Sequence, residues 1–81
     1  MQHVPRHGKG QVEKMTAEEL ARFIDQNVIG RKAYRNRQIL KLHFIDGYTY
    51  EQVAEAVEMS PVQVGRIVRR EGDKILLKIK K

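Results

Sequence analysis

Apolar residues recur at intervals of three and four in the first patterned segment of the chain: Leu20, Phe23, Ile24 and Val28. This spacing places them on one face of a helix. The capping box Thr16-Ala-Glu-Glu19 predicts where the helix begins, because the threonine side chain accepts a first-turn N–H and the glutamate reaches back. We therefore expect a first helix over about residues 17–28, with Gly30 as its stop signal.

A second helix is predicted over about residues 32–46. Its apolar residues are Tyr34, Ile39, Leu40, Leu42 and Phe44, and the last four have the spacing of a wide buried face. Gly47 follows as a C′ residue, since glycine adopts a positive φ at little steric cost.

Two more capping boxes predict the last two helices. Thr49-Tyr-Glu-Gln52 begins a short helix over about 50–57, and Ser60-Pro-Val-Gln63 begins a long one over about 61–79. Pro61 suits the first position of a helix, where its missing N–H costs nothing. Gly72 weakens the long helix by about 1 kcal/mol relative to alanine, so we expect it to bend or fray there.

No pair of strands is predicted, so the fold class is all-α with four helices. Residues 1–14 contain glycine and proline without apolar periodicity and are predicted to form a flexible arm. They lack the 7–15-residue apolar stretch of a signal peptide. The longest apolar run is Ile75–Leu77, which is far too short to span a membrane. We expect a soluble cytoplasmic protein of one domain, residues 15–81, behind the arm.

The composition argues for an acidic partner and against catalysis. The chain has 16 Lys and Arg against 10 Asp and Glu, a net charge of +6, and no cysteine. A basic small domain most often binds nucleic acid. The absence of cysteine excludes disulfides, cysteine-based zinc fingers, iron–sulfur sites and a cysteine nucleophile. Gly8-Lys-Gly10 follows no strand, so it is no phosphate loop. We expect no enzyme activity, no cofactor and no metal site, with His3 and His7 as the weak metal alternative.

The last two predicted helices have the pattern of a helix-turn-helix, although ordinary helical hairpins share it. Ala54 is small where the two helices must cross, and Met59 fills the gap in the turn. Basic residues then favour DNA binding, because Lys and Arg supply most non-specific affinity for phosphates. They lie on the fourth helix and in a stretch without acids before Asp46: Arg66, Arg69 and Arg70, and Arg31, Lys32, Arg35, Arg37 and Lys41.

Three segments together resemble region 4 of the sigma-70 family: Asn36-Arg-Gln-Ile-Leu-Lys-Leu-His-Phe44, Asp46-Gly-Tyr-Thr-Tyr-Glu-Gln-Val-Ala-Glu-Ala-Val57 and Met59-Ser-Pro-Val-Gln-Val-Gly-Arg-Ile67. The family pattern is matched at Arg37, Ile39, Leu40, Leu42, Phe44, Gly47, Thr49, Tyr50, Val53, Ala54, Ser60 and Val64. The resemblance covers about residues 17–77. Short chains of this kind also resemble regulators of phages and mobile elements in Gram-positive bacteria.

The resemblance implies a domain that binds the −35 promoter element with its last helix and contacts the polymerase flap and activators. Two departures limit this. The 81 residues hold no counterpart of region 2, so we do not expect the chain to melt a −10 element. The fourth helix begins with Pro61-Val62-Gln63 and Gly65-Arg66, where sigma factors often place more polar or charged groups.

Candidate base contacts lie in the N-terminal turns of the fourth helix, Pro61 to Arg66. Arginine pairs with guanine and glutamine with adenine, so Arg66 and Gln63 are the candidates. Val62 lies in the same turns. Gly65 is placed on the side of Gln63 and Arg66, where it would permit a close approach to DNA. The alternative is a solvated helix face.

Candidate phosphate contacts have structural alternatives. Ser60 and Thr49 either bind phosphate or only cap their helices. Arg35 and Arg37 are candidates in the second helix, with Glu51 or Glu55 as the competing partner of Arg37. Arg69 and Arg70 either bind phosphate or form ion pairs; the acids within reach are Glu71, Asp73 and Glu55.

Two functions remain open at this point. The first is a DNA-binding transcriptional regulator that contacts the major groove of duplex DNA with residues 61–71. The second is an interaction module that docks on RNA polymerase or an anti-sigma protein without binding DNA. The apolar tail Ile75–Ile79 suits that role or homodimerisation. A membrane-surface helix over Arg66–Lys81 is disfavoured, because its apolar face is needed for the core.

Overall fold

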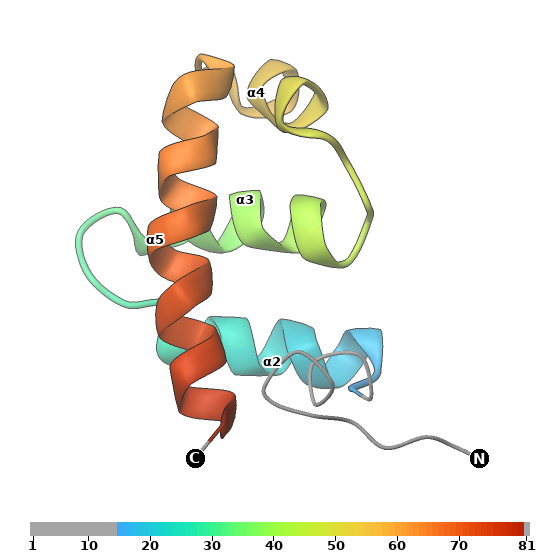
Figure 1. The fold of residues 1–81 in the computed structure, drawn as a ribbon, viewed down its shortest axis with the longest axis vertical. Coiled ribbons are helices and arrows are strands. Elements are labelled where there is room, and N and C mark those ends of the chain that lie inside the picture. Colours follow the sequence, from blue (N-terminus) through green and yellow to red (C-terminus); the bar gives the residue numbers. More distant parts are fainter. Residues whose placement is uncertain (1–14, 81) are drawn as a thin grey trace.

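The computed structural model describes residues 15–80, which form four helices: α2 (Ala17–Asn27), α3 (Ala33–Phe44), α4 (Tyr50–Val57) and α5 (Pro61–Lys80). In Figure 1, α2, α3 and α4 are stacked one above another beside α5, which runs along all three. The predicted all-α class and the four helices are confirmed. The predicted arm, residues 1–14, lies outside the described residues. No helix within residues 15–80 is long and apolar enough to cross a membrane.

All three predicted capping boxes form. Thr16 Oγ1 accepts from the Glu19 N–H at 3.0 Å, and Thr49 Oγ1 accepts from the Gln52 N–H at 3.2 Å. Ser60 Oγ accepts from the N–H of Gln63 at 3.2 Å. Each cap satisfies an N–H that the helix itself leaves without a partner. The starts of α2, α4 and α5 therefore follow directly from short sequence signals.

The helix ends depend on backbone conformation. After α3 ends at Phe44, Gly47 has φ +78, and the Tyr48 N–H donates to the Leu42 carbonyl at 3.0 Å. Ile45 is the C-cap of α3, so Gly47 lies at C″ and not at the predicted C′. Its positive φ, which glycine adopts at little steric cost, turns the chain away from the helix. The sequence did not indicate that Glu58, after α4, also has a positive φ, 59°. It turns the chain so that Met59 packs against the core.

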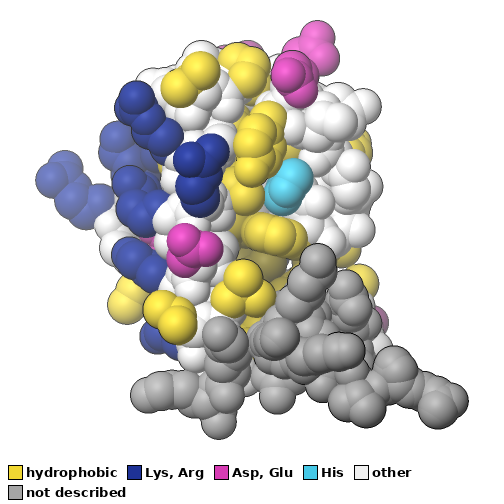
Figure 2. All heavy atoms as spheres, viewed as in Figure 1, with side chains coloured by type: hydrophobic (Ala, Val, Ile, Leu, Met, Phe, Trp, Pro, Cys, Tyr) yellow, Lys and Arg dark blue, Asp and Glu magenta, His cyan; other side chains and the backbone are white. Residues whose placement is uncertain are grey.

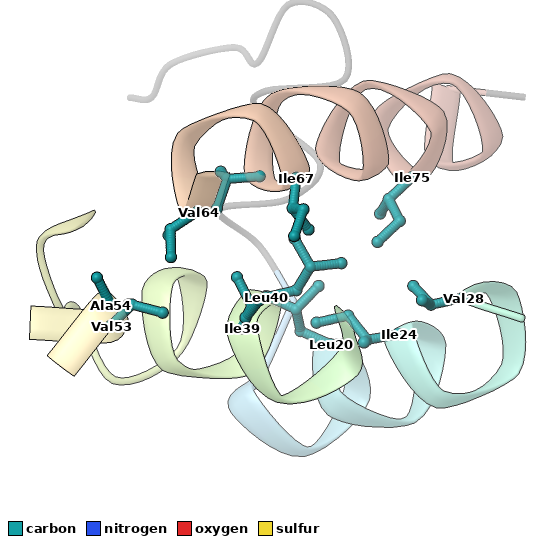
Figure 3. Close-up of a cluster of buried hydrophobic side chains, with 11 residues drawn as sticks. Leu20, Ile24, Val28, Ile39, Leu40, Val53, Ala54, Val64, Ile67 and Ile75 are labelled. Atoms are coloured by element: carbon teal, nitrogen blue, oxygen red, sulfur yellow. The ribbon is translucent and has the colours of Figure 1, made fainter. Parts of the chain in front are cut away.

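α5 organises the core, because it packs against both α3 and α4. In Figure 3 its side chains Val64, Ile67 and Ile75 face those of α3 and the neighbouring helices. The buried cluster comprises Leu20, Ile24, Val28, Ile39, Leu40, Val53, Ala54, Val64, Ile67, Val68 and Ile75. Every helix contributes to it, so the position of α5 is set along most of its length.

The two glycines of α5 are both buried, and each faces an aromatic ring. A Cβ on Gly65 would lie 3.2 Å from Cε2 of Tyr50, whereas a Cβ on Gly72 would lie 3.4 Å from Cζ of Phe44. The first distance is too short without a shift of the ring, and the second is close to ordinary contact. Fraying of the helix was predicted at Gly72, but α5 continues without interruption through this residue.

We predict that Gly72→Ala stabilises the domain by about 0.5–1 kcal/mol, because alanine recovers the helix propensity that glycine lacks. Gly65→Ala should gain less or destabilise, because Tyr50 must move. Urea unfolding followed by circular dichroism measures both changes. Equal stabilisation by the two variants would contradict the close approach of Tyr50 to Gly65.

Candidate nucleic-acid interface

One side of α5 faces away from the core and is exposed. Its N-terminal half carries five exposed side chains there, which we call the outer face of α5: Val62, Gln63, Arg66, Arg69 and Arg70. Val62 is 66% exposed although it is apolar. Arg66 and Arg69 form no ion pair or hydrogen bond with another described residue. Figure 2 shows Lys and Arg side chains gathered along the α5 side of the molecule. The outer face of α5 is therefore a basic surface with cations free to bind.

Gln63 is exposed but is used by the cap. Its side-chain Oε1 accepts from the Ser60 N–H at 3.3 Å, while its own N–H donates to Ser60 Oγ. A bidentate contact with adenine uses both the oxygen and the nitrogen of an amide. Gln63 would have to release Ser60 to make that contact, although its amide nitrogen can donate without doing so. The cap is sufficient to explain the presence of serine at position 60.

The placement of Gly65 on the outer face was wrong. Gly65 is buried, and the space beside it is filled by the ring of Tyr50 from α4. At about 100° per residue, Gly65 lies within about 60° of Val68 and about 20° of Gly72, both of which are buried. Its missing side chain permits close approach of α4 to α5.

Arg70 has an ion-pair partner, one of those foreseen as its alternative. Its Nε lies 3.2 Å from Oε2 of Glu71, and Lys74 Nζ lies 3.7 Å from the same oxygen. The Glu71 side chain is only 12% exposed, whereas that of Arg70 is 58% exposed. Pairs of this kind at a surface contribute little free energy, so a phosphate can compete for Arg70. Arg69 forms no such pair with a described residue.

The basic stretch before Asp46 does not form one surface. Arg37 Nε donates to the Val28 carbonyl at 2.8 Å, so Arg37 holds the end of α2 against α3. Neither Glu51 nor Glu55 is its partner. The phosphate contact predicted for Arg37 stays a prediction, and its remaining guanidinium N–H groups would have to make it. Lys41 pairs with Asp25 at 2.8 Å. Both side chains line an open groove of about 340 Å³ that includes Asp25 and Leu42, apart from α5.

Arg35 is half-buried beside Asn36, and it stays a candidate. Its Nη2 donates to Asn36 Oδ1 at 3.3 Å, and its Nε is buried with no partner among the described residues. Asn36 is the buried polar residue of this part of the chain. The buried Nε is out of reach of a phosphate, so a DNA contact by Arg35 would have to use its Nη donors.

We predict that Arg37→Ala lowers the free energy of unfolding by about 1 kcal/mol, because it removes a charge-assisted hydrogen bond in a partly exposed place. The midpoint of urea unfolding measures this. Gln38→Ala, at the exposed neighbouring position, is the control and should change little. An unchanged midpoint for Arg37→Ala would mean that the bond to Val28 contributes nothing to the fold.

The outer side of α4 has the opposite charge. Glu51, Glu55 and Glu58 are exposed there, and Thr49 uses its side chain in the cap. Carboxylates repel phosphates, so this side suits a position turned away from DNA. A phosphate contact at Thr49 would lie beside Glu51, which makes Thr49 a weaker candidate than the arginines of α5.

The aromatic cluster that supports α5 was only partly foreseen. Tyr50 was expected to be structural, and its ring packs on Gly65. The His43 ring lies 5.0 Å from that of Tyr50, and its Nδ1 is 2.9 Å from the Tyr48 carbonyl oxygen. Three acidic, histidine or cysteine side chains do not come together anywhere in the described residues to hold a metal ion. His3 and His7 lie outside them.

Comparison of the chain with protein-family models, curated protein sequences and solved structures finds no match. The function must therefore be inferred from the residues and their placement.

Proposed function

We propose that the protein is a DNA-binding transcriptional regulator that places the N-terminal turns of α5 in the major groove of duplex DNA. The observation that carries the proposal is the outer face of α5. It is exposed and basic, and its cations at positions 66 and 69 have no partner among the described residues.

The dimensions of this face suit the groove. Gln63, Arg66 and Arg70 follow at intervals of three and four, so they form a stripe that rises about 10 Å along the helix axis. The major groove is about 12 Å wide and admits a helix. α4 precedes α5 through the three residues 58–60, as in a helix-turn-helix, whose second helix inserts its N-terminal end.

The resemblance to sigma region 4 supports the same arrangement of α4 and α5, and it adds RNA polymerase as a proposed partner. Residues 1–14 include Arg6 and Lys9, and basic arms beside a helix-turn-helix can enter the minor groove. A regulator of this type acts in the cytoplasm, on the chromosome of the host or of a mobile element.

Binding of the full chain to random duplex DNA, measured by fluorescence anisotropy at several salt concentrations, tests the proposal. We expect affinity to fall as salt rises, by about 0.9 logarithmic units per phosphate contact and per tenfold change in salt. Selection of bound sequences then gives the preferred site. No DNA affinity at low salt, together with co-purification with RNA polymerase, would favour the interaction module instead.

A further inference from the structure

A second exposed surface lies near the C-terminal end of α5. Ile29, in the loop after α2, is 76% exposed, and Leu77, in α5, is 63% exposed. Figure 2 shows hydrophobic and basic side chains next to one another over the lower turns of α5. Position 78 is about 22 Å along the helix axis from Gln63, so this surface is separate from the proposed DNA contacts.

The loop and the helix enclose a pocket at this place. It has a volume of about 220 Å³ and is lined by Asn27, Ile29, Glu71, Lys74, Ile75 and Lys78. We call it the Ile29 pocket. Ile29 and Ile75 provide its apolar walls. Two lysines one helical turn apart lie at its side, so the pocket combines two apolar side chains with a lining that is otherwise polar and mostly cationic.

The border of the Ile29 pocket keeps a net positive charge after its ion pairs are taken into account. Glu71 is the one acid that lines the pocket, and its carboxylate already pairs with Arg70 and Lys74. Lys78 forms no ion pair with another described residue. The loop continues from Ile29 into the exposed Arg31 and Lys32. A ligand at this pocket therefore meets uncompensated positive charge around apolar side chains.

We propose that the Ile29 pocket binds an acidic amphipathic segment of a partner protein. An apolar side chain of the segment enters between Ile29 and Ile75, and its carboxylates pair with Lys78 and Lys74. This is the helix-in-groove type of recognition, with charge complementarity selecting the partner. The inference is independent of DNA binding, because it uses other residues at the other end of α5.

Two other occupants fit less well. A second copy of the chain in a two-fold contact would bring this surface against itself, so Lys74 and Lys78 would face their own copies and repel. Phosphates of DNA would satisfy the lysines but would leave Ile29 and the apolar walls without a partner. An acidic and apolar segment satisfies both features.

The probe for the test is a fluorescein-labelled 16-residue helical peptide with leucines along one face and glutamates elsewhere. A matched peptide carries serine in place of each leucine at the same charge. We expect the full chain to bind the leucine peptide at least tenfold more tightly in fluorescence anisotropy. NMR of the ¹⁵N-labelled chain should show amide shifts confined to residues 27–31 and 71–78. Equal affinity for both peptides, or shifts elsewhere, would overturn the proposal.

Variants locate the site. Ile29→Ser and Lys78→Glu should each lower the affinity for the leucine peptide at least fivefold. Arg22→Glu, on the exposed side of α2, is the charge control and should leave this affinity unchanged. Ile29 is exposed, so its change should leave the melting temperature intact. Unchanged peptide affinity in Ile29→Ser would exclude the pocket.

DNA binding separates this proposal from the proposed function. Ile29→Ser should leave the affinity for duplex DNA and its salt dependence unchanged, and Arg66→Ala should leave the peptide affinity unchanged. A parallel loss of DNA and peptide binding in Ile29→Ser would mean that the surface is part of the DNA interface, and it would overturn the separate partner site. Absence of DNA binding with an intact peptide response would overturn only the DNA proposal.

Discussion

Ala54→Glu is expected to unfold the domain. Ala54 is 4% exposed, on the side of α4 that packs against α5. A glutamate there would bury a charge, and an uncompensated buried charge costs about 3–5 kcal/mol. A chain of this length has a stability of roughly 4–12 kcal/mol, at about 0.05–0.15 kcal/mol per residue. The variant should therefore lose most of its helical circular dichroism at 37 °C or melt far below the parent protein.

Ala56→Glu is the matched control for that experiment. Ala56 lies two residues further along the same helix and is exposed, so the same change of side chain meets water. It should lower stability by no more than a few tenths of a kcal/mol, the scale of helix propensity. A stable, fully helical Ala54→Glu variant would show that α4 and α5 do not cross at Ala54.

The helix starts could be predicted from the sequence because their signals are local. A capping box needs four residues, and Thr49 to Gln52 carry all the atoms that form it. Most buried positions could be predicted for the same reason, since apolar spacing follows the geometry of the helix, but Tyr34, among the apolar residues of α3, is 84% exposed. The bond from Arg37 to the Val28 carbonyl could not, because it joins residues nine positions apart across a loop. The sequence of a basic stretch does not show which arginine or lysine forms a hydrogen bond within the fold.

Gly65 illustrates a different kind of error. The periodicity alone did not place it, since at about 100° per residue Gly65 lies about 60° from the buried Val68 and about 60° from the exposed Val62. Glycine suggested a close approach, and a close approach exists, but the partner is Tyr50. The sequence indicated the need for space correctly, and only the tertiary structure identifies what fills it.

Arg66→Ala is expected to weaken specific DNA binding by about 1–3 kcal/mol and to relax the preference at one base pair. Arg66 is exposed in the second turn of α5, one turn from Gln63, and no described residue holds its guanidinium. Arginine at such a place in a helix-turn-helix pairs with the N7 and O6 acceptors of guanine. Anisotropy titrations with the selected site, its single-base variants and random duplex measure the effect.

Two control variants distinguish a base contact by Arg66 from a general effect of charge. Arg22→Ala removes the same charge from the exposed side of α2 and should leave the discrimination between sites unchanged. Arg69→Ala, if Arg69 contacts phosphate, should lower the affinity for all DNA sequences alike. It should also reduce the slope of log affinity against log salt concentration by about one unit. Because both arginines lie on the outer face of α5, the comparison separates a base contact from simple charge. Equal losses on specific and random DNA for Arg66→Ala would make Arg66 a phosphate contact, and the base-specific contacts would then have to come from Val62 and Gln63 in the first turn.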